Sequence, residues 1–276
     1  MTFRDFSPNV TCLGFKILIK LNQYYSTKDY KEKILKKTLI LMTVCISFIT
    51  NVNANDFLKL ADKELKEQNY KQASNLLQKA CDIENFDGCY ALGVLNEDGL
   101  GIEKNKQKAI NLYKKACENN HKEACNNLAT IYYNDNKTEE ALKLYTQACN
   151  NGENIACSNI AKMYYIGKNI TKSYQKSREY WDKACEKNEK DSCYYLAKLY
   201  LNGYGASIDY QKAKSFYEKS CDLGCASGCY ALSVLYTDGI GVRQSQSTAK
   251  EYYGMACDLG SLKGCERYKR LNEQGY

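Results

Sequence analysis

The chain has 276 residues, a formal net charge of +7 and fifteen cysteines. Residues 1–54 hold eight Lys and Arg against three Asp and Glu, so most of the positive excess belongs to the N-terminal segment and the remainder is nearly neutral. A basic excess confined to one end gives little support to nucleic-acid binding, and we expect no nucleic-acid partner.

The N-terminal segment has the pattern of a secretory signal peptide. Residues 31–37 are basic and residues 38–49 are apolar, and small residues precede a cleavage position after Ala54. The apolar run is too short for a comfortable transmembrane helix, so we expect no stable membrane insertion after cleavage. The alternative is an uncleaved anchor. The prediction is a leader over 1–54 and a secreted or periplasmic product beginning at residue 55.

The signal pattern starts unusually far along the chain. Residues 1–30 have no periodic pattern, whereas a chain starting near Leu35 would have the basic-then-apolar form of a signal peptide. We therefore hypothesise that translation starts downstream of Met1. Cys12 and Cys45 would leave with the leader.

Residues 55–276 contain an internal repeat marked by pairs of cysteines eight positions apart. The first cysteines of successive pairs are 36, 32, 36, 36 and 36 residues apart. A fixed period of this size is typical of a solenoid. Helical periodicity on both sides of each pair predicts an all-α fold, an α/α solenoid of TPR-like helix pairs of about 36 residues.

In each repeat we expect a B helix that ends near the first cysteine and an A helix that starts near the second. In the B helices a small residue stands eight before the cysteine and a large one four before it, as in Ala109 and Tyr113. In the A helices Leu or Ile usually stands three after the second cysteine. These positions share one face and predict the core. A further aromatic stripe is more typical of core than of a ligand groove, which stays the alternative: Tyr132, Tyr164, Tyr200 and Tyr236.

Most A helices end in glycine-rich turns, such as residues 98–102 and 238–242. A phosphate-binding loop needs a following Gly-Lys-Ser/Thr, which these turns lack. Residues 133–137 replace the glycine turn in the repeat with the 32-residue spacing. The last helix, from Cys265 onward, carries polar residues where another repeat would dock, and this predicts a C-terminal capping helix.

The cysteine register predicts one disulfide between each B helix and the next A helix, which would meet at a short turn. The alternative for so many cysteines is metal binding in the cytosol, but zinc sites favour closer spacing, often with histidine, and the only histidine is His121. We expect no metal and no cofactor. Cys225 lies between Cys221 and Cys229 and is predicted to be a free thiol. The predicted pairs are Cys81–Cys89, Cys117–Cys125, Cys149–Cys157, Cys185–Cys193, Cys221–Cys229 and Cys257–Cys265.

These motifs resemble Sel1-like repeats, and specifically the Helicobacter cysteine-rich protein (Hcp) family. The matching elements are Lys-Ala-Cys-Asp/Glu before the turn, Gly-Cys-Tyr-Ala-Leu after it and Asp-Gly-x-Gly-Val in the loop, most fully between Cys221 and Val242. The resemblance covers about residues 55–276. It implies an exported α/α solenoid, a β-lactamase label with binding of penicillin-like compounds, and host interaction for some members.

The residues themselves give this enzymatic label little support. Ser173 and Lys176 fit Ser-x-x-Lys, but the Ser-Asp-Asn and Lys-Thr-Gly partners of serine β-lactamases are absent. Ser173 opens a predicted B helix, where serine is a common cap. His121 is interpreted as a solvated residue at a helix start. Catalytic residues stay unknown, and the enzyme assignment stays uncertain.

A solenoid offers an extended concave face. We therefore expect the exported protein to bind a peptide, protein or peptidoglycan-derived ligand on that face. The alternatives are a β-lactamase-type hydrolase of penicillin-like compounds, as the resemblance implies, and a purely structural assembly scaffold.

Overall fold

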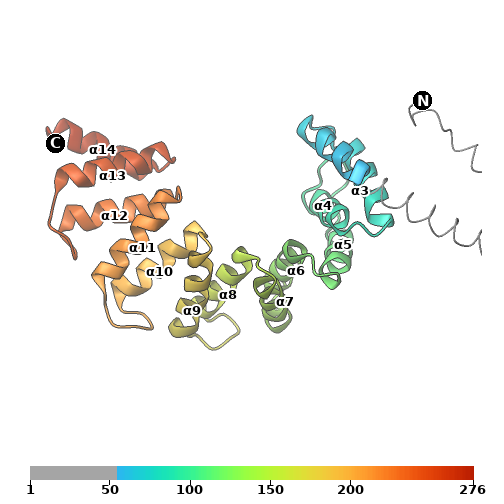
Figure 1. Ribbon diagram of the computed structural model, residues 1–276, viewed down its shortest axis with the longest axis horizontal. Coiled ribbons are helices and arrows are strands. Elements are labelled where there is room, and N and C mark those ends of the chain that lie inside the picture. The colour runs from blue at the N-terminus through green and yellow to red at the C-terminus, as the bar shows by residue number, and fades with distance from the viewer. Residues whose placement is uncertain (1–54) are drawn as a thin grey trace, which may run out of the picture. The chain divides into compact units, whose positions relative to one another are not determined.

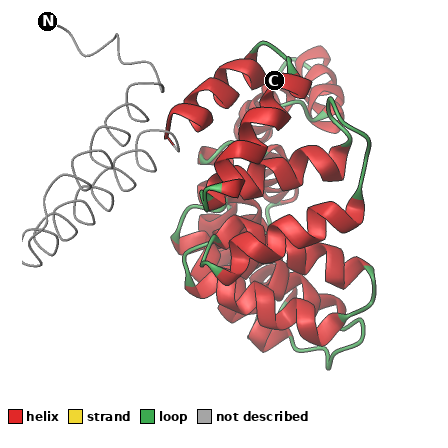
Figure 2. Cartoon of the chain, turned by 90° about the vertical axis from the view of Figure 1, so that its right-hand side faces the viewer, coloured by secondary structure: helices red, strands yellow, loops and turns green. Residues whose placement is uncertain are grey.

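The computed structural model describes residues 55–276. The predicted leader, its cleavage site, Cys12 and Cys45 lie outside the described residues and stay predictions. Within residues 55–276 the chain forms helices and loops without a strand (Figures 1 and 2). None of the described helices combines the length and apolar character needed to cross a bilayer.

The chain divides into two compact units, and the boundary falls between Ile83 and Glu84. The described part of the first unit contains a helix over 55–66 and helix α3 (Tyr70–Asp82). Ala61 in the first helix and Leu77 in α3 are buried, as the helical spacing of apolar residues predicts.

The second unit is a stack of A and B helices that alternate along the chain, and each packs against the next (Figure 1). The predicted all-α, α/α solenoid is therefore confirmed. The A helices are α4 (Phe86–Asp98), α6 (Lys122–Asn134), α8 (Asn154–Ile166), α10 (Lys190–Asn202), α12 (Ala226–Asp238) and α14 (Leu262–Glu273). The B helices are α5 (Lys106–Glu118), α7 (Thr138–Asn150), α9 (Tyr174–Glu186), α11 (Tyr210–Asp222) and α13 (Gln246–Asp258).

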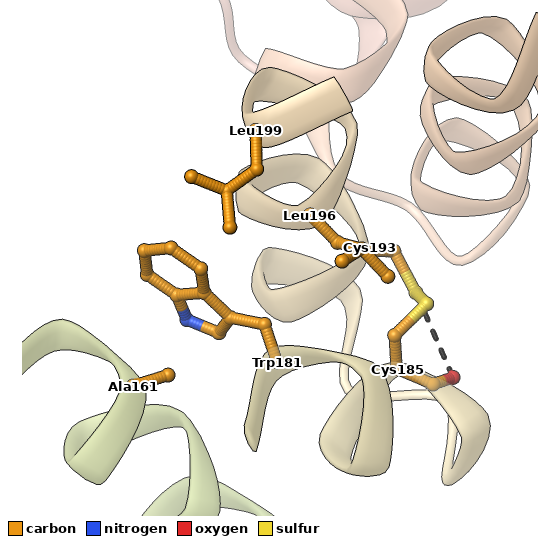
Figure 3. Close-up of a cluster of buried hydrophobic side chains, with 6 residues drawn as sticks. All are labelled: Ala161, Trp181, Cys185, Cys193, Leu196 and Leu199. Atoms are coloured by element: carbon orange, nitrogen blue, oxygen red, sulfur yellow. Dashed lines mark hydrogen bonds between the residues drawn. A yellow bond between two sulfur atoms is a disulfide. The ribbon is translucent and has the colours of Figure 1, made fainter. Parts of the chain in front are cut away.

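The core follows the predicted alternation of small and large residues. In the cluster of Figure 3, the indole of Trp181 packs with Ala161 of the preceding A helix and with Leu196 and Leu199 of the following one. The small residues are needed because the helix backbones approach closely. The packing between α4 and α5 is tight, because a Cβ placed on Gly93 in α4 would lie 2.6 Å from the ring of Tyr113 in α5.

The length of the loop between the A helix and the following B helix explains why one repeat spacing is 32 residues and the others are 36. Residues 203–209 join α10 to α11, and Gly203 and Gly205 there have φ of 67° and 72°, which side chains disfavour. A Cβ on Gly205 would also lie 2.6 Å from the carbonyl carbon of Tyr174. Residues 135–137 alone join α6 to α7. The four missing residues account for the 32-residue repeat.

Each repeat boundary in the second unit is closed by a disulfide between the last turn of a B helix and the first turn of the next A helix, with Cα–Cα distances of 4.5–4.9 Å. Cys81 and Cys89 are disulfide-bonded as well. A disulfide that closes a loop of about nine residues contributes about 2.5 kcal/mol to the free energy of unfolding in the chain-entropy model. The bonds are Cys117–Cys125, Cys149–Cys157, Cys185–Cys193, Cys221–Cys229 and Cys257–Cys265.

Cys225 is a free thiol in the described part of the chain, and it is buried. It is the N-cap residue of α12, and its Sγ lies 3.5 Å from Oδ1 of Asp191 on α10. The side chain therefore packs between two successive A helices, away from the Cys221–Cys229 bond of its own loop.

Candidate functional site: a polar and aromatic stripe on the A helices

The A helices carry half-buried polar and aromatic side chains one and two positions after the second cysteine. In a helix the second of these positions neighbours the core position six after that cysteine, so these side chains border the core, and Tyr194, Tyr195 and Tyr230 pack against it. From α4 to α12, each A helix has such a side chain at one or both of these positions. We define the A-helix stripe as Tyr90, Asn126, Asn127, Asn159, Tyr194, Tyr195 and Tyr230.

Asparagines occupy the part of the stripe on α6 and α8 and form a hydrogen-bonded row. The Asn159 side-chain amide donates to Oδ1 of Asn126 over 3.0 Å, and the Asn126 amide donates to Oδ1 of Asn127 over 3.3 Å. Within residues 55–276, Oδ1 of Asn159 has no protein donor, so it is available to accept a hydrogen bond. Thr130 Oγ1 donates to the backbone carbonyl of Asn126 and holds this part of α6 in place.

His121 lies at the end of the stripe on α4 and α6. Its ring stacks on Tyr90 with centroids 4.6 Å apart, and Nε2 lies 3.2 Å from Oδ1 of Asp87. Nδ1 accepts a hydrogen bond from the backbone N–H of Ala124 as the N-cap of α6, which assigns the proton of the neutral ring to Nε2. The helix-start position was predicted correctly. The expected solvation is wrong, because only 10% of the His121 side chain is exposed once Tyr90 covers it.

Tyr90, which stacks on His121, and the neighbouring Tyr113 both have raised pKa values. Burial, followed by the Glu123 carboxylate, raises the pKa of Tyr90. Burial, together with the hydrogen bond from Tyr113 Oη to Glu97 (2.8 Å), raises the pKa of Tyr113 far above its ordinary range. Both hydroxyls therefore stay protonated at neutral pH and act as neutral hydrogen-bonding groups.

Aromatic rings dominate the stripe on α10. Tyr195 stacks on the buried Trp181 with centroids 4.9 Å apart, and Tyr194 meets Tyr195 edge to face at 5.2 Å. Two lysines lie near these rings: Lys198 Nζ is 5.8 Å from the Tyr194 centroid and Lys162 Nζ is 6.0 Å from that of Tyr195. This end of the stripe offers apolar surface bordered by positive charge.

Ser173 and Lys176 do not form a catalytic pair in the structure's described contacts. Ser173 is the N-cap of α9, and its Oγ accepts the Lys176 backbone N–H over 3.3 Å. The Lys176 ammonium lies 5.0 Å from the ring centroid of Tyr164. Residues 55–276 contain no cluster of three or more His, Cys, Asp or Glu side chains suited to a metal ion.

The aromatic stripe predicted from the sequence is distinct from the A-helix stripe and lies at the edge of the core. It consists of Tyr132, Tyr164, Tyr200 and Tyr236. Three of its members are half-buried and stack on an aromatic ring of the following B helix: Tyr164 on Tyr180, Tyr200 on Phe216 and Tyr236 on Tyr252. In contrast, no sequence motif pointed to Asn126, Asn127 and Asn159. Their positions, one or two residues after the second cysteine of a pair, are the signal that could have found them.

A family model described as the Sel1 repeat matches residues 64–84, 86–121, 122–153, 154–189, 190–225 and 226–261. Two curated relatives from Helicobacter pylori, HcpC and HcpE, carry names that include beta-lactamase. HcpC is 36% identical over 75 residues, covering 27% of this chain and 26% of HcpC. HcpE is 37% identical over 65 residues, covering 21% of this chain and 18% of HcpE. The matched segments thus span 18–26% of these relatives.

Solved structures show the same fold. A Sel1 repeat protein from Oxalobacter formigenes superimposes with a TM-score of 0.70 at 19% identity, over 78% of this chain and 97% of that chain. A protective antigen of uropathogenic Escherichia coli with an SLR fold gives a TM-score of 0.72 at 25% identity, over 80% of this chain and 49% of that chain.

Proposed function

The chain belongs to the Sel1 repeat family, and from this premise we propose that it is an exported binding protein whose A-helix stripe holds an extended peptide segment of a partner protein. The observation that carries the proposal is the row of asparagine amides that runs across α6 and α8. An extended peptide presents one N–H donor and one carbonyl acceptor per residue, and an asparagine amide offers both a donor and an acceptor to it.

The position of the row favours a peptide over a compact ligand. Asn126 and Asn159 come from successive repeats and are joined by a hydrogen bond, so the two amides bridge neighbouring A helices in the direction in which these helices stack. The A helices α10 and α12 also contact each other directly, as expected on the inner side of a bending solenoid. A chain lying along this side would meet one helix after another.

The aromatic part of the stripe would select side chains. Tyr194 and Tyr195 give a flat apolar surface. The ammonium groups of Lys162 and Lys198 lie 6.0 and 5.8 Å from the centroids of Tyr195 and Tyr194, respectively, and add positive charge beside them. We therefore expect a partner segment in which apolar or aromatic residues alternate with acidic ones. Fragments of peptidoglycan also carry short peptides, and they are a second outcome of the binding test.

Export to the periplasm or beyond the cell belongs to the same proposal. Disulfides persist in oxidising compartments and are rare in the cytosol, and every repeat boundary of the second unit carries one. The basic and apolar pattern of residues 31–49 supports the same destination. Hydrolysis of penicillin-like compounds rests on the relatives' names alone, and Ser173 and Lys176 are engaged in other contacts, so we do not propose it.

The test is a selection of random dodecapeptides on the oxidised protein, followed by affinity measurements on the variant Asn126→Ala/Asn159→Ala. We expect the selected peptides to lose affinity about tenfold for each amide hydrogen bond removed. Asn111→Ala, an exposed asparagine on a B helix, is the matched control and should bind as the native protein does. Equal binding by the double variant would refute the assignment of the site.

A further inference from the structure

A pocket of about 270 Å³ lies between α5, α6 and α7, and none of its lining residues belongs to the A-helix stripe. Its apolar lining comes from Leu128 and Tyr132 on α6, Leu144 on α7 and Cys117 on α5. For comparison, an engineered cavity of about 150 Å³ lined by apolar side chains stays dry and binds benzene. The pocket is therefore large enough for an aromatic ring with a substituent.

The sister repeats show what this position normally holds. In three later repeats the tyrosine seven after the second cysteine stacks on a ring that stands five before the next first cysteine. The centroids are 6.2 Å apart for Tyr164–Tyr180, 5.7 Å for Tyr200–Phe216 and 5.7 Å for Tyr236–Tyr252, and the ring planes differ by only 12–15°. In the repeat of α6 and α7 the same two positions are Tyr132 and Leu144. The tyrosine is present, but the ring that should cover it is missing.

A lysine accompanies two of these three stacks, and a lysine also lies beside Tyr132. Lys176 lies 5.0 Å from the Tyr164 centroid and Lys212 lies 5.2 Å from that of Tyr200. In the repeat with the pocket, Lys137 lies 5.3 Å from the centroid of Tyr132. Tyr132 thus has a lysine beside its ring, as two of its three sister tyrosines do, although this lysine stands at a different position of the repeat, and it lacks the second aromatic ring.

The rim of the pocket is charged but balanced. Lys114 pairs with Glu118 at 3.9 Å, and Lys143 and Glu140 add one further charge of each sign. Such a rim complements a neutral group better than an anion or a cation, because either charge would meet repulsion from half of the rim. This favours a phenyl or phenol ring without a formal charge.

We propose that the pocket between α5, α6 and α7 binds an aromatic side chain of a partner peptide, which supplies in trans the ring that Tyr180, Phe216 and Tyr252 supply within their own repeats. The ring stacks on Tyr132 and contacts Leu128 and Leu144. This site is independent of the proposed function, since it uses none of the residues of the A-helix stripe.

The test uses p-cresol, the side-chain analogue of tyrosine, and the methyl NMR signals of the oxidised protein. A ring stacked on Tyr132 should move the methyl signals of Leu128 and Leu144 upfield in a saturable way. The control ligand is 4-methylcyclohexanol, which has a similar size but no aromatic ring. We expect it to bind at least several-fold more weakly. Equal binding of the two compounds, or no saturable shift with p-cresol, overturns the proposal.

Two variants make the test specific. Leu144→Tyr recreates the sister arrangement, so it should abolish the p-cresol shifts at Leu128 and raise Tm by about 2–4 °C through the new aromatic pair. Tyr180→Leu in the next repeat should do the reverse and open a second site, detected at the methyl groups of Ile160. Undiminished shifts at Leu128 in Leu144→Tyr, or no new shift at Ile160 in Tyr180→Leu, contradict the proposal.

Discussion

Removing the disulfide Cys185–Cys193 tests how much the disulfides stabilise the fold, at a boundary where the fluorescence of Trp181 reports unfolding. Both sulfurs are buried, and they pack in the same cluster as Trp181, the only tryptophan of the chain (Figure 3). The double variant Cys185→Ala/Cys193→Ala removes the constraint on a loop of about nine residues, which is worth about 2.5 kcal/mol in the chain-entropy model. Loss of two buried sulfur atoms adds a packing cost in the same direction.

The assay is urea unfolding followed by Trp181 fluorescence. In a repeat array each repeat contacts only its neighbours, so the fluorescence reports chiefly on the repeats around α9 and α10. We expect the midpoint of this transition to fall by about 1 M, given a slope of about 1–3 kcal/mol/M. The matched control, Cys117→Ala/Cys125→Ala, removes an equivalent bond two boundaries away and should shift the tryptophan transition less.

Two results would refute this reasoning. An unchanged midpoint in Cys185→Ala/Cys193→Ala would mean that the bond does not stabilise the array. Equal shifts from the two double variants would mean that the described helices unfold as one cooperative block, so that the bonds do not act on separate boundaries. Cys225→Ala, which removes a buried thiol without breaking a disulfide, separates the loss of sulfur volume from the loss of the bond.

Four further predictions concern single positions. Gly93→Ala should destabilise the protein by about 1–3 kcal/mol in a thermal melt, because the new methyl group meets the Tyr113 ring; an unchanged Tm would contradict the close packing. Stability should fall as pH rises above about 10, where tyrosines ionise in the unfolded chain while the raised pKa of Tyr113 keeps it protonated in the folded one; the difference between the urea midpoints at pH 9 and 11 should be smaller in Tyr113→Phe than in the native protein, and an equal difference would contradict this. Leu112→Tyr should lower Tm, because Leu112 is 8% exposed and Asn96, not a tyrosine, stands at the A-helix position that would stack on the new ring. A higher Tm would contradict the idea that a ring at this B-helix position needs a stacked tyrosine. Ser173→Ala should cost about 1 kcal/mol through loss of the α9 cap, measured by the same melts, and no loss would show the cap to be unimportant.

The fold was predictable from the sequence because its main constraint is local and repeated. Ala109 and Tyr113 stand at fixed distances from a cysteine, and their equivalents recur in every B helix, so one interpretation is tested six times along the chain. The bonded cysteines lie at the ends of adjacent helices, where the three-residue turn fixes their approach. Sequence spacing therefore carried most of the information that packing needs.

The candidate sites depend on contacts between repeats, which spacing does not carry. The hydrogen bond from Asn159 to Asn126 joins residues 33 positions apart, and nothing in either segment alone predicts it. His121 was misjudged for the same reason, since its burial depends on Tyr90 of another helix. The pocket at Tyr132 could be found only by comparison with the stacked pairs, because it consists of volume that Leu144 leaves unfilled.

The central claim, that the A-helix stripe binds an extended peptide, is tested most directly by a crystal structure of the oxidised protein with a selected peptide. The account predicts that the peptide runs along the A helices with its backbone hydrogen-bonded to the side-chain amides of Asn126, Asn127 or Asn159. A peptide that lies on the B helices, or that reaches the A helices without any contact to these amides, would contradict it.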